Sequence, residues 1–225
     1  MTRRAELWAQ FRLLSEISAF CPEEQALLER FLDEESRLRQ AKKIGYLLAR
    51  SGIKRVKTLG DFDWRFNPKI PRDKLLEFIA HPWLKVPCNL VLIGPAGVGK
   101  THLAQALCHD AVMKGHQALF ISLFDLMAKI SRASNLYNAI EFYAKIPVLC
   151  LDEVGYAFPS KDQADAIFQV IAKRAESKTT LMTTNLVPSQ WNKVFDATTA
   201  TAILDRLTMN GTFLTMEGRS YRSRK

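Results

Sequence analysis

The sequence predicts an α/β fold, in which helices flank a central parallel sheet of five strands, and a small all-helical module precedes it. From about residue 88, short and wholly apolar runs alternate with helical patterns, which is typical of a parallel sheet covered on both faces. Residues 5–50 instead carry apolar side chains at three- and four-residue steps, with no β-rich run. A chain of 225 residues has room for both parts.

The strands and helices can be assigned in order from the same patterns. Gly52 and Gly60 interrupt the helical pattern, so we expect a helical module at 1–58 and the sheet domain at 59–225. The chain ends soon after its last apolar run, and no full C-terminal lid domain is expected. Strands are predicted at 90–93, 118–121, 147–151, 180–183 and 212–215, and helices at 101–114, from about 124, at 162–176 and around 199–207.

The composition favours a soluble cytoplasmic protein. Apolar residues make up 48% and charged residues 24% of the chain, and no apolar run approaches the roughly 20 residues that span a bilayer. No membrane partner and no signal peptide are therefore expected. The cysteines are scattered rather than paired, as reduced buried thiols are; they are Cys21, Cys88, Cys108 and Cys150.

Basic residues are concentrated in two acid-free segments, and the formal net charge is +9. The first runs from Arg37 to Lys57, and the second contains Arg219, Arg222 and the last two residues. Such runs are either solvated faces or contacts to the phosphates of DNA or RNA. Two of them in one small protein favour nucleic acid.

Residues 94–101 match the phosphate-binding pattern G-x-x-x-x-G-K-[ST] in full, between an apolar strand and a helix. Glycines let the backbone wrap phosphate oxygens, and the helix N-terminus adds positive potential. Lys100 is expected to reach the β- and γ-phosphates of ATP, and the Thr101 hydroxyl to bind Mg²⁺. The predicted nucleotide-binding residues are Gly94, Pro95, Ala96, Gly97, Val98, Gly99, Lys100, Thr101 and His102, together with Asp152.

A pair of acids follows the third predicted strand, where ligands of open α/β sheets bind. Asp152 is the predicted second ligand of Mg²⁺. Glu153 is placed to polarise an attacking water, which favours hydrolysis of the nucleotide over transfer to a small molecule. The alternative is a strand end with solvated acids.

Two later polar residues complete the predicted catalytic set. Asn185 ends the fourth strand and is expected to orient the attacking water, unless it only caps a turn before Pro188. Arg206 could reach the γ-phosphate on a neighbouring subunit as an arginine finger, unless it only pairs with Asp205. Upstream, Phe62 and Phe66 are either packing anchors or the cover of a bound adenine.

Taken together, these residues resemble the AAA+ ATPases of the initiator and helicase-loader clade, and most of all the IstB-like helpers of transposases. The resemblance covers the chain from about residue 30. It is carried by the loop and by Leu151–Tyr156, Phe168–Arg174, Thr184–Leu186, Gln190–Trp191, Leu204–Leu207 and Gly218–Arg222, with Lys57–Asp63 joining the two modules.

The resemblance implies a DNA-binding ATPase that helps a transposase to select its target. It implies a homo-oligomer on double-stranded DNA, held through backbone contacts, with ATP at the subunit interfaces. Arg222 is left with two roles, one near the nucleotide and one on DNA. A DnaC-type loader of the replicative helicase is the alternative, and a small-molecule kinase fits poorly because it leaves Glu153 and Asn185 unexplained.

Overall fold

The computed structural model describes residues 3–11 and 17–223, and the chain divides into two compact units. The first unit is Met1–Tyr46 and the second Leu47–Lys225. This division falls before the boundary that the glycine pattern predicts at residue 58. The reason is that the intervening residues bond to the sheet, where the Phe120 N–H donates to the Ser51 carbonyl at 2.7 Å.

The first unit is helical over its described residues, as the sequence predicts. It contains α1 (Arg3–Gln10), the 3₁₀ turn η1 (Ile17–Ala19) and most of α2 (Pro22–Ala49). Pro22 opens α2, with two glutamates in the first turn, where a fixed φ and negative charge suit a helix N-terminus. The amide of Gln10 donates to Ser36 Oγ at 2.9 Å and so ties α1 to α2.

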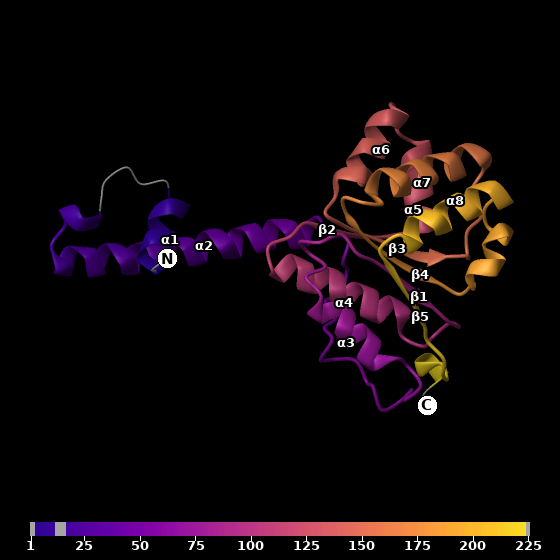
Figure 1. The fold of residues 1–225 in the computed structure, drawn as a ribbon, viewed down its shortest axis with the longest axis horizontal. Helices are drawn as coiled ribbons and strands as arrows, with labels where there is room; N and C mark the ends of the chain where they lie inside the picture. Colours follow the sequence, from indigo (N-terminus) through magenta and orange to yellow (C-terminus); the bar gives the residue numbers. More distant parts are fainter. Residues whose placement is uncertain (1–2, 12–16, 224–225) are drawn as a thin grey trace. The chain divides into compact units, whose positions relative to one another are not determined.

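The second unit is built on a five-stranded parallel sheet in the order β2-β3-β4-β1-β5 (Figure 1). All five predicted strands are confirmed. Four are one or two residues longer than the pattern indicates, and the third begins one residue later and ends three residues later. They are β1 (Asn89–Ile93), β2 (Ala118–Ser122), β3 (Val148–Val154), β4 (Thr179–Thr184) and β5 (Gly211–Thr215).

Helices cover both faces of this sheet (Figure 1). Helix α4 packs across β1 to β4 on one face, and α5, α7 and α8 pack on the other. Ser122, Asn135, Ser160 and Asp196 cap the N-termini of α5 to α8 in turn through their side-chain oxygens. The helices are α3 (Arg72–Ala80), α4 (Lys100–Met113), α5 (Leu123–Ser131), α6 (Leu136–Lys145), α7 (Lys161–Arg174) and α8 (Ala197–Thr208), with 3₁₀ turns η2 (Pro188–Lys193) and η3 (Tyr221–Ser223).

Three of these elements go beyond the sequence-based assignment. The helix expected from about residue 124 is in fact two helices, α5 and α6, because Asn135 starts a new helix with its own cap. Helix α3 and the turn η2 follow Pro71 and Val187 without a side-chain cap, so the sequence signals them only weakly.

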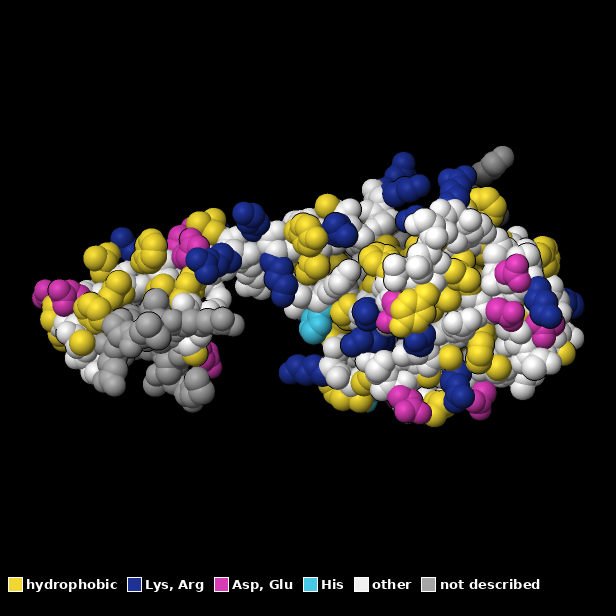
Figure 2. All heavy atoms as spheres, turned by 90° about the horizontal axis from the view of Figure 1, so that it is seen from above, with side chains coloured by type: hydrophobic (Ala, Val, Ile, Leu, Met, Phe, Trp, Pro, Cys, Tyr) yellow, Lys and Arg dark blue, Asp and Glu magenta, His cyan; other side chains and the backbone are white. Residues whose placement is uncertain are grey.

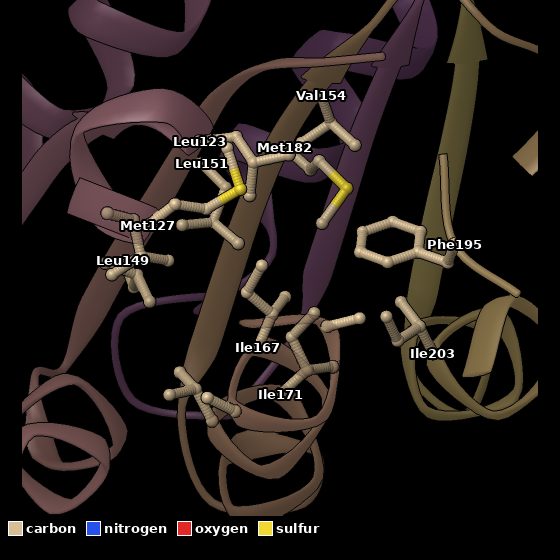
Figure 3. Packing of buried hydrophobic residues seen from close by; sticks show 14 of the residues in the cluster. Leu123, Met127, Leu149, Leu151, Val154, Ile167, Ile171, Met182, Phe195 and Ile203 are labelled. Carbon is tan, nitrogen blue, oxygen red and sulfur yellow. The ribbon is translucent and has the colours of Figure 1, made fainter. Parts of the chain in front are cut away.

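The alternation of side chains along β3 places the core on one face and the chemistry on the other. Leu149 and Leu151 point into an apolar cluster with Ile167 of α7 and Met182 of β4 (Figure 3). With period two, Asp152 therefore faces α4. The same helix carries the phosphate loop at its N-terminus, so the fold brings the two predicted motifs together.

Arg174 is a fully buried cation that ties α7 to its neighbours. Its guanidinium donates to the carbonyls of Tyr143 (2.8 Å), Ile146 (2.6 Å) and Thr179 (2.5 Å) and to the Thr180 hydroxyl (3.1 Å). Burial lowers the pKa of Arg174 to about 9. The side chain thus satisfies the carbonyls at the end of α6 and the start of β4.

Among the described helices, none is long and apolar enough to cross a membrane.

Candidate nucleotide site

The phosphate-binding loop connects β1 to α4, as the pattern predicts. Gly99, the residue before α4, has φ 104°, and a side chain there would collide with the ring of Phe62. Lys100 is 7% exposed, and its Nζ donates to the carbonyls of Gly94 and Pro95, each at 2.7 Å. Burial lowers the pKa of Lys100, whereas the nearby Asp152 carboxylate raises it.

Asp152 meets the loop directly, and this confirms that the two predicted motifs converge. The Thr101 hydroxyl donates to Asp152 Oδ1 at 3.1 Å. The Thr183 hydroxyl of β4 donates to the same oxygen. Asp152 is only 4% exposed, so these two hydroxyls stabilise a buried carboxylate. The role of Thr183 has no signal in the sequence beyond its place at a strand end.

Glu153 lies next to Asp152 but is exposed. Its φ is 61°, a left-handed conformation that is uncommon for residues other than glycine. Its N–H donates to the Thr183 hydroxyl at 3.0 Å. The buried carboxylate and the exposed one therefore occupy different environments, which suits the separate roles predicted for them.

Asn185 follows β4 and packs against the turn after Glu153. Its Oδ1 is buried without a hydrogen-bond partner among the described residues. Gly155, with φ 111°, leaves no room for a side chain because Asn185 Oδ1 occupies that space. An unpartnered buried acceptor beside Gly155, two residues after Glu153, is consistent with a polar role at this site.

Arg206 stands apart from the other predicted catalytic residues. It lies on α8, where its side chain is 42% exposed and pairs with Asp205 at 3.4 Å. Like Asp152, Glu153 and Asn185, it is not among the described residues that line the cavity at the loop. The intramolecular pair that the sequence left open is therefore present, and the arginine-finger role stays a prediction.

A cavity of about 300 Å³ opens beside the loop. That volume is at the lower end of the range of roughly 300–1,000 Å³ for small-molecule sites. Phe62 and Phe66 both line it, and Phe62 also packs edge-on against the His102 ring at 5.3 Å. The other lining residues are Lys57, Asp61, Asp63, Asn67, Ile70, Gly97, Val98, Gly99, Lys100, Thr101, His102, Tyr221 and Arg222.

His102 and the residues after β5 fix two walls of this cavity. The His102 Nε2 lies 3.0 Å from the Thr58 carbonyl and so anchors the segment that carries Phe62. The Tyr221 N–H donates to the Gly97 carbonyl at 2.9 Å, which brings the C-terminal residues onto the phosphate loop. Arg222 lines the cavity, and its charge lowers the pKa of Lys100.

The described basic residues of the two predicted segments are mostly exposed, and the last two residues of the second segment, Arg224 and Lys225, lie outside the described residues. Part of the first segment is locally neutralised. Arg37 and Arg39 form ion pairs of 2.6 Å with Glu34 and Glu35, one turn earlier on α2. Lys54 and Arg55 are exposed in the second unit. Lys and Arg side chains protrude from the viewed surface (Figure 2).

Comparison with known proteins assigns a family. A family model described as IstB-like ATP binding protein matches residues 13–225. An IS21 insertion-sequence protein of Pseudomonas aeruginosa, named for ATP binding, is 38% identical over 192 residues, which are 84% of this chain and 69% of the relative. A protein from IS232 of Bacillus thuringiensis subsp. berliner, also named for ATP binding, is 37% identical over 170 residues. These residues are 74% of this chain and 68% of the relative.

Solved structures share the fold. The chain is similar to DnaI, with a TM-score of 0.61 and 22% identity over 73% of this chain and 89% of DnaI. It is also similar to the DnaC helicase loader, with a TM-score of 0.56 and 22% identity over 68% and 98% of the two chains. At this level of identity the likeness shows the fold alone. The five-stranded parallel sheet with its loop and flanking helices is the AAA+ P-loop fold.

Proposed function

Because this chain belongs to the family of IstB-like ATP-binding proteins, we propose that it is a magnesium-dependent ATPase that assembles on double-stranded DNA and helps a transposase in target selection. The observation that carries the proposal is the contact between Thr101 and Asp152 at the phosphate loop. It joins two motifs that lie 51 positions apart in the sequence and that a nucleotide triphosphate with its metal requires together.

The loop would hold the phosphates through its backbone N–H groups and Lys100. The Lys100 ammonium donates to two loop carbonyls. In the bound state it would turn from those carbonyls to the β- and γ-phosphates, which are stronger acceptors because they are charged. Burial of this lysine strengthens its attraction to a phosphate, since the local dielectric is lower than in water.

Thr101 and Asp152 fit a magnesium ion. Mg²⁺ prefers oxygen ligands and is commonly held by one or two protein groups plus the phosphates of the nucleotide. The Thr101 hydroxyl and Asp152 Oδ1 are two such oxygens, already within 3.1 Å of one another. The ion would neutralise charge on the phosphates.

Glu153 and Asn185 would handle the attacking water. Glu153 is exposed beside the buried metal ligand, so its carboxylate is free to accept a proton from water. The unpartnered Asn185 Oδ1 would accept a hydrogen bond from the same water and orient it. In phosphoryl transfer, the positioning of the reacting groups contributes more than covalent chemistry by the protein does.

The aromatic side of the cavity would hold the adenine. Phe62 and Phe66 lie on its walls with Ile70, and they offer apolar faces for a base to pack on. Arg222 lines the same cavity, close enough to Lys100 to affect its pKa. Between the two roles left open by the sequence, this position supports the one near the nucleotide.

The basic side chains support the proposed contact with DNA phosphates. Lys42 and Lys43 on α2, and Lys54 and Arg55 after it, are exposed cations. Contacts of this kind bind the backbone without reading bases, and counterion release makes their affinity fall steeply with salt. Arg206 would act across a subunit interface, where its exposed guanidinium could meet the γ-phosphate of a neighbour.

A helicase loader is the second candidate, because the DnaC loader and DnaI share the fold. The transposition reading is favoured by the names of the more similar relatives, which are insertion-sequence proteins at 37–38% identity. Pull-down with a transposase or with a replicative helicase as bait separates the two candidates.

DNA binding with nucleotide tests the proposal directly. Fluorescence anisotropy of a duplex would be followed with ATP, a non-hydrolysable ATP analogue and ADP, each at low and moderate salt. We expect tight binding only with the triphosphates and a clear loss at moderate salt. Binding that ignores both nucleotide and salt would contradict the proposed DNA assembly.

A further inference from the structure

The pairing of β3 with β4 is interrupted at the two acids. Leu151 pairs with Met182 and Val154 pairs with Thr184, so two residues of β3 stand opposite Thr183 alone. This is a β-bulge, a feature that re-aims side chains and is common beside active sites. It turns Glu153 out to solvent while Asp152 stays buried.

The side chain of Thr183 bonds to both residues of the bulge. Its hydroxyl accepts the Glu153 N–H at 3.0 Å and donates its one proton to Asp152 Oδ1. These bonds use the only proton of the hydroxyl and one of its two lone pairs, so both neighbours determine its orientation. Thr183 is 1% exposed, so water does not substitute easily for either bond.

We propose that Thr183 is the positioning residue of this ATPase, holding the metal-ligating and the water-activating carboxylate in fixed relation through one hydroxyl. The inference rests on the proposed hydrolysis. It adds a residue that lies on a different strand from both acids and that is not among the described residues that line the cavity. Glu153 keeps an unfavourable φ of 61°, and the bond to Thr183 contributes to holding it there, together with the Tyr156 N–H that donates to the Glu153 carbonyl.

Thr183→Val and Thr183→Ser distinguish positioning from plain stability. Valine keeps the shape and removes the hydroxyl, whereas serine keeps the hydroxyl and removes a methyl group. The matched control is Thr180→Val, which removes another buried hydroxyl of β4, one that accepts from Arg174 and lies outside the site. Thermal unfolding of all three variants measures the structural loss that they share.

The first readout is the split between kcat and KM for ATP. Thr183→Val should lower kcat roughly tenfold to a hundredfold, since small displacements of catalytic groups have effects of that size, with KM changed much less. Thr183→Ser should recover most of the loss, and Thr180→Val should keep the wild-type kcat. A Thr183→Val enzyme as active as Thr180→Val would overturn the inference.

The second readout does not depend on turnover. Binding of a non-hydrolysable ATP analogue is measured with Mg²⁺ and with a chelator. Thr183→Val should lose much of the tightening that Mg²⁺ gives, because Asp152 is no longer held, while binding in chelator stays at the wild-type level. Unchanged tightening would overturn the inference. Wild-type protein without turnover would instead refute the proposed hydrolysis, and this second readout would then decide on Thr183.

Discussion

The Asn67 side chain and the Arg219 backbone hold each other through two hydrogen bonds across 152 positions of sequence. The amide of Asn67 donates to the Arg219 carbonyl at 2.8 Å and accepts the Arg219 N–H at 2.9 Å. The Arg219 guanidinium also lies over the Phe66 ring, 5.4 Å from its centroid. The two segments that flank the nucleotide cavity are thereby joined.

Asn67→Ala is expected to weaken ATP binding without removing any group that we place on the phosphates. The loss of two buried hydrogen bonds, each worth about 1 kcal/mol, would loosen Tyr221 and Arg222 at the cavity. We expect the Kd of a fluorescent ATP analogue to rise about threefold to tenfold. Asn192→Ala, at an exposed position of η2, is the control. Equal Kd values for the two variants would show that the joined segments do not shape the cavity.

Lys100→Ala should weaken nucleotide binding severely. The charged contact to the β- and γ-phosphates is lost, and a loss of roughly a hundredfold in affinity follows from a charge-assisted bond of about 3 kcal/mol. Isothermal titration with ATP and Mg²⁺ measures this. Lys114→Ala, at the exposed end of the same helix, should bind as the wild type does. Retained affinity in Lys100→Ala would remove the lysine from the phosphate site.

Arg206→Ala should impair turnover only in the assembled protein. Arg206 lies on α8, where it is exposed and paired with Asp205, and its proposed action is on the nucleotide of a neighbouring subunit. ATPase activity per subunit should rise with protein concentration in the wild type and stay low in the variant. Lys193→Ala, which removes an exposed cation of η2, is the control. A defect that is equal at all concentrations would contradict a role across the interface.

Arg174→Met should destabilise the sheet unit strongly. It leaves the carbonyls of Tyr143, Ile146 and Thr179 without this donor, and an unsatisfied buried acceptor typically costs about 1–3 kcal/mol. The free energy of unfolding in urea measures the change. Lys173→Met, at the exposed neighbouring position, should change stability little. Similar unfolding curves for both variants would contradict the proposed contribution of the Arg174 contacts to the free energy of unfolding.

The sequence predicts those features of the fold and site that depend on neighbouring residues. The loop at 94–101, the apolar strands and the acids after β3 are local patterns, and the fold brings them together as expected. The bulge opposite Thr183 and the bonds between Asn67 and Arg219 are not local. They depend on strand pairing and on contacts between distant segments, which no spacing in the chain encodes.

Local sequence also leaves the roles of some single residues undecided, for the same reason. The sequence around Arg206 fits both an arginine finger and a pair with Asp205, and the structure shows the pair. Splitting of the predicted helix after residue 124 follows from a cap at Asn135, a residue type that is also common in loops. A local sequence pattern therefore predicts where the site lies better than it predicts the role of each residue in it.

Phosphate release from ATP by wild-type protein and by Glu153→Gln tests the central claim most directly. Glutamine keeps the size of the side chain but cannot accept a proton from water, and general-base catalysis typically contributes about 10²- to 10⁴-fold. We expect Mg²⁺-dependent turnover in the wild type, and turnover at least about a hundredfold lower in Glu153→Gln with ATP affinity unchanged. Equal phosphate release by the two proteins, or none by the wild type, would contradict the account.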